Sequence, residues 1–380
     1  MRICHVGFNF FPGRGLTIFY EFALNQARQG IKVTAIAPGR PDEPAFQIVD
    51  GIRVHRIALS SIGRFSLDRI RFLIRASQII RSEAFDLIHV YAFAGAGPLP
   101  LLAGRRRSKW LYDCQSSAIK PPFLRLQNWL IRVEASLFDA VTVLSEGIRD
   151  IVFGEGRSIQ AIVPLGANLD HFMPRSPDPA LMSRFGFSGT DCIFAYCGTL
   201  DHNRRIDKLL AAFSVVARSE ETAKLLIVGD GSELEALKNQ ARALGLQDRI
   251  TFTGFVPYTD IPAYLSIARI ALAFVPMEPH FEHQPPTKTV EYLAQGLPVL
   301  ATNTAGNRVF VQHEFNGLLC EDRAESVGLS MLELIRDTGK RTRLAANARD
   351  SVRAYDWSEI VRTQVVPVYR NVLREGRFAR

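Results

Sequence analysis

The chain has 380 residues, of which 47% are hydrophobic and 22% are charged, and its formal net charge is +8. This length is enough for two α/β domains with separate cores, and the composition excludes a largely disordered chain. Residues 1–170 hold 21 Lys and Arg against 14 Asp and Glu, whereas the remainder holds 25 against 24, so the first half is expected to meet an anionic partner. Nucleic acid, an acidic membrane surface and a phosphorylated acceptor all fit that charge.

The start of the chain predicts a strand that leads into a glycine turn and then a helix. Residues 2–8 are apolar, residues 9–15 contain two glycines, and apolar side chains recur at helical spacing from Phe19. A β-branched run over 31–37 follows. This order is the opening of a doubly wound parallel sheet.

The same order recurs in the second half of the chain. An apolar strand over 192–197 runs into Gly198, a helical pattern begins at Ile206, and a short strand follows at 225–228. Because runs that are apolar on both faces suit parallel sheets, we expect an α/β protein with two Rossmann-like, doubly wound domains. Further strands are expected at 52–57, 86–90, 110–113, 140–144, 250–253, 270–274, 298–301 and 317–320.

Three prolines mark residues 168–191 as the expected connection between the domains. The first domain is predicted to span residues 1–170 and the second residues 171–357. Each domain would then hold one parallel sheet.

The last helical pattern, over 357–373, contains Pro367. Proline removes a backbone hydrogen bond and bends a helix. We expect a kinked terminal helix, about residues 358–380, that leaves the second domain and packs on the first.

The cysteines and the most apolar segments predict a cytoplasmic protein, either free or peripheral on the inner face of the membrane. None of the five cysteines belongs to a C-x-x-C pair, and most stand in apolar runs, so we expect buried, reduced thiols. Residues 1–6 have a strand pattern rather than that of a signal peptide. Residues 87–104 contain two prolines and several glycines, so a strand, a loop and a helix start are expected there instead of a membrane span.

The glycine turn Gly13-Arg14-Gly15 is the first candidate site. Glycine lets backbone N–H groups approach a phosphate, and the following helix would offer its positive N-terminus. A tight turn without a ligand is the alternative.

A pair of cations after the strand over 192–197 is the second candidate. Arg204 and Arg205 stand at the head of a helix, where positive charge is unfavourable unless an anion lies between it and the helix end. A diphosphate would meet that condition, and a solvated pair is the alternative.

The third candidate follows Pro285 and Pro286, which preset a helix start. Free N–H groups at Thr287 and Lys288 are placed to bind phosphate oxygens. Glu291, one helical turn further on, would reach ribose hydroxyls, or it is an ordinary surface glutamate.

Taken in order, these segments resemble the retaining glycosyltransferases of family 4, which have the GT-B fold, and the resemblance covers nearly the whole chain. The family's Gly-Arg-Leu-x-x-x-Lys-Gly is matched by Gly198-Thr199-Leu200-x-x-x-Arg204-Arg205. The other matches are Val163-Pro164-Leu165-Gly166-Ala167-Asn168-x-x-x-Phe172, Val228-Gly229-Asp230-Gly231, Ile250-Thr251-Phe252-Thr253-Gly254-Phe255-Val256 and Glu291-Tyr292-Leu293-Ala294-Gln295-Gly296-Leu297-Pro298-Val299.

The resemblance implies a role for each matching position. Arg204 would act on the donor diphosphate, Glu291 would bind the ribose, and Phe255 with Val256 would line the base pocket. The positions assigned to the donor are Gly15, Gly198, Thr199, Arg204, Arg205, Gly229, Gly254, Phe255, Val256, His283, Thr287, Lys288 and Glu291. The catalytic positions would be Arg204, Asp113 and Gln115.

Three positions depart from the family pattern. Thr199 replaces an arginine, His283 with Glu282 beside it stands where the family has a second glutamate, and Gln115 stands where relatives have histidine in Tyr-Asp-x-His-Glu. A glutamine amide is neither an acid nor a base, although it still forms hydrogen bonds.

The resemblance implies transfer of a sugar, with retention, from a UDP- or GDP-sugar to a glycan, lipid-linked or small-molecule acceptor. Cell-surface polysaccharide or glycolipid synthesis would be the setting. No D-x-D pair occurs, so no metal on the diphosphate and no cofactor beyond the nucleotide sugar are expected. His280 and His283 have H-x-x-H spacing, which is either a metal site or, because no third ligand is evident, an ordinary loop.

The expected acceptor or membrane surface is basic. It comprises a helix over 66–81, in which arginines alternate with Leu67, Ile70, Leu73 and Ile74, and the arginines Arg14, Arg69, Arg105, Arg106 and Arg107. This pattern fits an anionic lipid surface, or a solvated face over an ordinary core contact.

Three other functions stay open. A GT-B relative that binds nucleotide or glycan without transfer fits the three departures, and an epimerase or phosphorylase would share the architecture. A nucleic-acid binder would explain the charge, but no motif for it occurs, so nucleic acid is not an expected partner.

Overall fold

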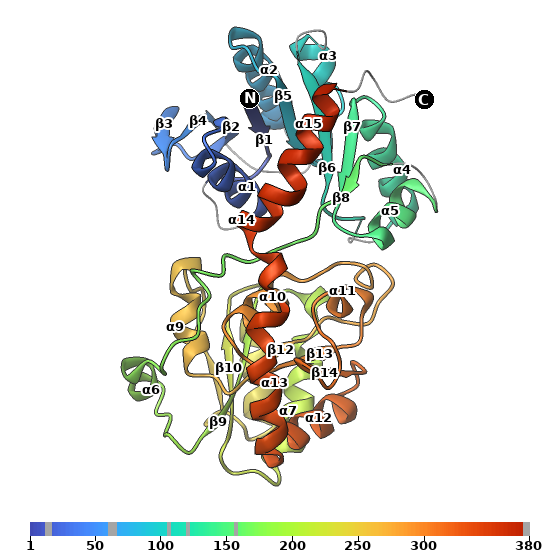
Figure 1. Cartoon of the computed structure of the whole chain (residues 1–380). Helices are drawn as coiled ribbons and strands as arrows, with labels where there is room; N and C mark the ends of the chain where they lie inside the picture. The colour runs from blue at the N-terminus through green and yellow to red at the C-terminus, as the bar shows by residue number, and fades with distance from the viewer. Residues whose placement is uncertain (12–16, 60–66, 105–107, 119–121, 156–158, 375–380) are drawn as a thin grey trace. The chain divides into compact units, whose positions relative to one another are not determined.

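The computed structural model describes residues 1–11, 17–59, 67–104, 108–118, 122–155 and 159–374 and divides into two units (Figure 1). Unit 1 consists of Met1–Leu165 and Trp357–Arg380, and unit 2 consists of Gly166–Asp356. The chain therefore crosses between the units twice.

The proline-containing stretch 168–191, expected as the connection between domains, lies within unit 2. Its buried Phe172 packs against Tyr258, with ring centroids 5.5 Å apart. Arg349 donates hydrogen bonds to the carbonyl oxygens of Phe172 and Leu169, at 2.8 and 2.9 Å. These contacts tie the stretch to the second unit even though its prolines exclude most regular structure.

Unit 1 is built on a sheet of eight strands in the order β3-β4-β2-β1-β5-β6-β7-β8. All neighbouring pairs are parallel except β3 with β4, and Cys4 of β1 lies opposite Thr34 of β2 and Ile88 of β5. The near-continuous apolar runs predicted this parallel core. The strands are β1 (Arg2–Val6), β2 (Lys32–Gly39), β3 (Phe46–Val49), β4 (Ile52–Ala58), β5 (Leu87–Tyr91), β6 (Lys109–Cys114), β7 (Ala140–Val143) and β8 (Ala161–Ile162), and the helices of Met1–Leu165 are α1 (Thr17–Arg28), α2 (Leu67–Ser82), α3 (Leu99–Ala103), α4 (Leu124–Ala135) and α5 (Glu146–Phe153).

The edge strand β3 escaped the sequence prediction, as did the two-residue β8. Phe46 and Ile48 are exposed, so the strand lacks the apolar run of a buried one. It pairs with β4 through a two-residue turn, Asp50-Gly51, in which both residues have positive φ, 52° and 80°. Asp-Gly is the signal of a type I′ hairpin and would have revealed β3.

Unit 2 has a six-stranded parallel sheet in the order β11-β10-β9-β12-β13-β14. Its main core lies where Phe194 of β9 meets Phe213 of α7 and Met331 of α12, all fully buried. The strands are β9 (Cys192–Cys197), β10 (Ala223–Val228), β11 (Ile250–Phe252), β12 (Ile270–Ala273), β13 (Val299–Thr302) and β14 (Gly317–Cys320); the α-helices are α6 (Pro179–Arg184), α7 (Ile206–Ala217), α8 (Leu234–Ala243), α9 (Ile261–Ser266), α10 (Thr287–Ala294), α11 (Ala305–Arg308), α12 (Ala324–Arg336) and α13 (Thr338–Ser351); and the 3₁₀ turns are η1 (His202–Arg204), η2 (Tyr258–Asp260) and η3 (Arg353–Tyr355).

The kinked C-terminal helix belongs to unit 1, as predicted, and Figure 1 shows it in red among the elements of that unit. It consists of α14 (Trp357–Ile360), a π turn η4 (Val361–Val365) and α15 (Val366–Arg374). Pro367 has no N–H for the carbonyl four residues earlier, so the backbone widens into a π turn just before it. Tyr369 then fixes α15 by accepting a hydrogen bond from Gln26 of α1 at 3.1 Å.

All five cysteines are buried and none is in a disulfide, which agrees with the expected reduced thiols. Among the described helices, none combines the length and the apolar character that a membrane span requires. The stretch 87–104 instead forms β5, a loop and α3.

Candidate functional site

The candidate donor site lies at the carboxyl ends of the unit 2 strands. From β9 the chain first adds β10 and β11 on one side, and later β12, β13 and β14 on the other. The boundary between β9 and β12 is therefore the point where the strand order reverses, and ligands of doubly wound sheets bind at such points. Gly198 and Arg204 follow β9, and Lys288 follows β12 on α10.

Two glycines let backbones meet at this edge. Gly229, just after β10, has a φ of 150°, and a Cβ built on it would lie 1.9 Å from the carbonyl oxygen of Gly198. Gly198 has a φ of 155°, and a Cβ there would lie 2.8 Å from the Lys288 Nζ. A side chain at Gly229 would thus push the two backbones apart, and one at Gly198 would close the space in which the ammonium group lies.

Arg204 and Lys288 are both half-buried cations held by aromatic rings. The Lys288 Nζ lies 3.8 Å from the centre of the Tyr196 ring, and the Arg204 Cζ lies 5.2 Å from the centre of the Phe281 ring. Among the described residues, no carboxylate lies within ion-pair distance of either cation. The Tyr196 hydroxyl is buried and has no hydrogen-bond partner in the described part of the chain.

This arrangement is electrostatically costly. Burial, and then the charge of Arg204, lower the pKa of Lys288 to about 7. A lysine with a lowered pKa beside an arginine loses its proton easily. An anion bound there would be stabilised by both side chains.

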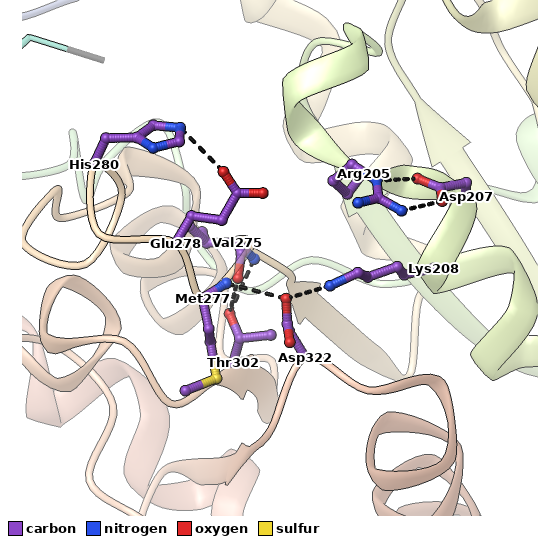
Figure 2. A network of polar contacts seen from close by, with 9 residues as sticks. All are labelled: Arg205, Asp207, Lys208, Val275, Met277, Glu278, His280, Thr302 and Asp322. Carbon is purple, nitrogen blue, oxygen red and sulfur yellow. Dashed lines mark hydrogen bonds and ion pairs between the residues drawn. The ribbon is translucent and has the colours of Figure 1, made fainter. Parts of the chain in front are cut away.

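The neighbouring cations, by contrast, are already paired (Figure 2). Arg205 binds Asp207 through two hydrogen bonds of 3.0 and 2.9 Å, and Lys208 binds Asp322 at 2.7 Å. Arg205 also has a φ of 51°, a conformation that favours glycine, which is the residue that the family pattern has here. If Arg205 assists Arg204 as predicted, the Arg205 side chain has to leave Asp207.

Helix α10 carries the other predicted donor residues. Its first residue, Thr287, follows Pro286, and no side chain caps its N-terminus, so its first N–H groups are available to a ligand. Glu291 is buried one turn further along and contributes an attraction to Lys288.

The remaining predicted donor positions lie around this edge. Thr199 is exposed and His283 is half-buried. Gly254 accepts a hydrogen bond from the Gly229 N–H at 3.1 Å, and beyond it Phe255 is exposed and Val256 is buried. Glu282, by contrast, accepts hydrogen bonds from the backbone N–H groups of Ala305 and Gly306, through its side chain and its carbonyl oxygen, respectively.

The loop with H-x-x-H spacing places His280 3.4 Å from Glu278 (Figure 2). In the described part of the chain, no group of three or more His, Cys, Asp or Glu side chains is arranged to hold a metal ion.

In unit 1, Asp113 and Gln115 meet at the carboxyl end of β6. Asp113 is buried, and its carboxylate accepts hydrogen bonds from Gln115 Nε2 at 2.8 Å and from Thr142 Oγ1 at 2.9 Å. His89 Nε2 lies 3.3 Å from the same carboxylate. Asp113 is thus engaged inside the protein, whereas its hydrogen-bond donor Gln115 is only half-buried.

The predicted acceptor or membrane arginines fall into two groups. Arg14 and Arg105, Arg106 and Arg107, together with the predicted donor residue Gly15, lie outside the described residues. Arg69 turns inward: it donates to the carbonyl oxygen of Ala94 at 2.6 Å and stacks over the Phe8 ring.

Sequence reasoning missed the aromatic residues Tyr196 and Phe281, which hold the two cations of unit 2. It also missed the buried polar residues of unit 1, above all His5, His89 and Tyr369. The signal for His5 and His89 was available, since a histidine within an apolar strand needs a partner. For Tyr369 no sequence signal was available, because its partners are hundreds of positions away.

Two family models match consecutive parts of the chain. "Glycosyl transferase 4-like domain" matches residues 16–166 and "Glycosyl transferases group 1" matches residues 178–351. Together they leave residues 1–15, 167–177 and 352–380 unmatched.

Comparisons with individual proteins agree with the two family matches. The chain is 28% identical over 288 residues to the GDP-mannose-dependent alpha-(1-6)-phosphatidylinositol monomannoside mannosyltransferase of Mycobacterium tuberculosis, covering 69% of this chain and 70% of that protein. It is 26% identical to N-acetyl-alpha-D-glucosaminyl L-malate synthase of Bacillus anthracis, covering 94% and 93%. Its fold is similar to that of Anabaena HepE, solved in complex with UDP and glucose, with a TM-score of 0.75, 18% identity and coverage of 97% and 99%.

Proposed function

Because the chain belongs to the glycosyl transferases group 1 and has the GT-B fold, we propose that it moves a sugar from a UDP- or GDP-sugar bound by unit 2 to an acceptor bound by unit 1. The chain is a glycosyltransferase, and its relatives include proteins named for glycolipid synthesis. The nucleotide, the sugar and retention at the anomeric carbon are parts of the proposal.

The observation that carries the proposal is that Arg204 and Lys288, at the strand-order reversal of unit 2, have no carboxylate of the described residues within ion-pair distance. A diphosphate would supply that close counter-charge. It would also accept hydrogen bonds from the first N–H groups of α10 and from the Tyr196 hydroxyl.

In the proposed reaction, the bond between the anomeric carbon and the diphosphate oxygen breaks, and the diphosphate gains negative charge. Arg204, Lys288 and the N-terminus of α10 would stabilise that charge, which lowers the barrier. Glu291 would bind the ribose, and Phe255 with Val256 would contact the base. The proposal requires no protein-bound metal, because Arg204 and Lys288 would neutralise the charge of the diphosphate.

The acceptor hydroxyl would be bound at the carboxyl edge of the unit 1 sheet, next to Gln115. Its oxygen forms the new glycosidic bond on the same face of the sugar, and its proton passes to the leaving phosphate oxygen. We propose a lipid-linked or glycan acceptor, since the mannosyltransferase named for phosphatidylinositol monomannoside matches 69% of the chain; a small-molecule acceptor is the alternative, since the relative named for L-malate matches 94%.

The surface of α2 supports peripheral association with an anionic bilayer. Leu67, Ile70 and Ile74 are exposed, at 85%, 56% and 46%, and they alternate with the exposed Arg71 and Arg75. The only apolar residue of the predicted pattern that enters the core is Leu73. An exposed surface that mixes leucine, isoleucine and arginine matches the interface of acidic lipids.

Co-sedimentation with phosphatidylglycerol vesicles and with phosphatidylcholine vesicles tests this surface. We expect the protein to sediment with the anionic vesicles, and the double variant Ile70→Glu/Ile74→Glu to lose most of that binding. Leu329→Glu, at an exposed leucine on α12 of unit 2, is the matched control and should bind as the unchanged protein does. Equal binding to both lipids, or equal loss in both variants, would contradict the docking surface.

A thermal-shift panel of UDP, GDP, ADP and their sugars, followed by an assay for released nucleoside diphosphate, tests the function. A ligand that binds only the native protein raises its apparent stability by mass action. We expect one nucleotide class to raise the melting temperature, and its sugar to be consumed when acceptor is added. Binding without any release would favour the alternative, a GT-B relative that binds without transfer, which the neutral side chain of Gln115 also fits.

A further inference from the structure

A chain of buried polar side chains crosses unit 1 from β1 to the C-terminal helix and ends at Asp113. Tyr91 Oη lies 3.0 Å from His5 Nδ1, and His5 Nε2 lies 3.0 Å from Gln26 Oε1. Gln26 Nε2 donates to Tyr369 Oη at 3.1 Å, and Tyr369 Oη lies 2.6 Å from His89 Nδ1. We name these residues, with Asp113, the unit 1 relay.

The orientation of the Gln26 amide sets the direction of every hydrogen bond in the relay. Its Nε2 donates to Tyr369, which leaves the Tyr369 hydroxyl hydrogen for His89 Nδ1, and the Asp113 carboxylate beside His89 Nε2 favours the tautomer that accepts it. His89 then carries its proton on Nε2, facing the Asp113 carboxylate. At the other end, the Gln26 Oε1 accepts from His5, and His5 Nδ1 accepts from Tyr91.

The charges in this region agree with that order. Burial, and then the neighbouring His89 ring, lower the pKa of His5 to about 3, so His5 is neutral and has a single N–H to give. Asp113 accepts hydrogen bonds from Thr142 and Gln115, and His89 Nε2, which has no hydrogen-bond partner among the described residues, faces the same carboxylate at 3.3 Å. Gln115 meets this carboxylate with its NH₂ group, which donates to an oxygen of Asp113.

This arrangement has a consequence for the side chain of Gln115, which is half-buried. Once Gln115 Nε2 is bound to Asp113 at 2.8 Å, its Oε1 points away from that carboxylate. We infer that Gln115 presents a hydrogen-bond acceptor to the hydroxyl of the incoming acceptor substrate, and that Tyr369 of the C-terminal helix is the positioning residue that holds this orientation through His89 and Asp113. The inference deepens the proposed function and rests on it for the identity of the substrate hydroxyl.

Tyr369 matters more than its distance from Gln115 would imply, because the His89 contact with Asp113 is long. At 3.3 Å it depends on the ring being held from its other side, and the Tyr369 hydroxyl at 2.6 Å does this. Removing that hydroxyl frees the ring, leaves the Gln26 amide without its acceptor, and loosens the carboxylate that orients Gln115.

The test compares two buried tyrosines of the same relay. Tyr369→Phe and Tyr91→Phe each remove one hydroxyl, but only Tyr369 lies between Gln26 and His89. We expect Tyr369→Phe to lower kcat by about three- to tenfold and to leave the KM for the nucleotide sugar unchanged, whereas Tyr91→Phe keeps kcat within about twofold. Gln115→Met, which keeps the length and removes the acceptor, should lower kcat by at least about tenfold. Equal kcat values for the two tyrosine variants, or an unchanged kcat in Gln115→Met, would overturn the inference.

A spectroscopic readout keeps this test independent of turnover. In protein labelled with ¹⁵N-glutamine, the Gln115 side-chain NH₂ signals, assigned by their loss in Gln115→Met, should shift in Tyr369→Phe and stay in place in Tyr91→Phe. Shifts of equal size in both variants would show that the relay does not position Gln115, whether or not a donor sugar has been found. Absence of transfer in the unchanged protein, with the NH₂ shift as expected, would reject the proposed function and leave the positioning role standing.

Discussion

Unit 1 and unit 2 differ in how the polar groups at the carboxyl ends of their central strands are paired. In unit 1 the relay ends on Asp113, whose carboxylate accepts hydrogen bonds from Gln115 and Thr142. In unit 2 no carboxylate of the described residues lies within ion-pair distance of Arg204 or Lys288, and the pKa of Lys288 falls to about 7. Hydrogen-bonded groups fix geometry in advance, whereas cations without a close counter-charge have affinity for an anion.

The largest effect is expected when both unpaired cations are removed. Arg204→Gln/Lys288→Met should weaken binding of the preferred nucleotide sugar by about 100-fold or more, because each charge-assisted hydrogen bond is worth roughly 1.5–3 kcal/mol. Titration calorimetry measures the loss. Lys208→Met is the matched control, since Lys208 is already paired with Asp322, and it should stay within about threefold.

The next largest effect concerns the backbone that shapes the site. Gly229→Ala should destabilise unit 2 by about 3 kcal/mol or more, because the new Cβ would meet the Gly198 carbonyl oxygen at 1.9 Å. Gly245→Ala tests positive φ alone: its φ is 68° and nothing lies within 4 Å, so about 1 kcal/mol is expected. Equal shifts of the urea midpoint in the two variants would show that the close approach of the two glycines is unimportant.

A smaller effect is expected in the hydrogen-bonded network around Asp113 of unit 1. Thr142→Val removes one of the hydrogen bonds to Asp113 and should cost about 1 kcal/mol of unfolding free energy. Nucleotide-sugar affinity should not change, since Thr142 and Arg204 belong to different units. A drop in affinity would contradict the separation of roles between the units.

The smallest effect is expected at Arg205. Arg205→Gly removes the pair with Asp207 but relieves a positive φ, so stability should change by about 0.5 kcal/mol or less in either direction. Nucleotide-sugar affinity should stay within about twofold. A loss of affinity close to that of Arg204→Gln/Lys288→Met would show that Arg205 binds the diphosphate.

The sequence predicted what depends on local pattern and missed what depends on distant partners. Continuous apolar runs indicated the parallel strands, and Pro367 indicated the kink, because each feature acts within a few residues. Arg204 was found because the start of a helix after a strand is an unusual place for a cation, whereas Lys288 was predicted for its backbone N–H group and not for its ammonium group. Their lack of counter-charge was not visible, since pairing is decided in three dimensions: Arg205, next to Arg204 in sequence, is neutralised by Asp207.

The unit 1 relay shows the same limit more clearly. Gln26 and Tyr369 are 343 positions apart and touch only because the C-terminal helix returns to unit 1. The sequence predicted that return but not which side chain it would deliver. Gln115 was identified only as a departure from the family pattern, and the direction of its amide follows from the Asp113 carboxylate.

The pKa of Lys288 gives the unligated protein a distinct response to pH. A base whose pKa is about 7 in the folded protein and 10.5 in its ordinary state holds fewer protons when folded, so its contribution to stability rises with pH between those values. A bound diphosphate would restore the ammonium form. Binding above pH 7 should therefore take up a proton.

Proton uptake on binding is the most direct test of the unpaired cations. Calorimetric titration with the preferred nucleotide sugar at pH 8.5, in two buffers of different ionisation enthalpy, measures it. The diphosphate of a nucleotide sugar does not itself titrate near this pH, so uptake should approach one proton in the unchanged protein and fall close to zero in Lys288→Met. Tight binding with no proton uptake, or with the same uptake in both proteins, would show that Lys288 does not face the diphosphate.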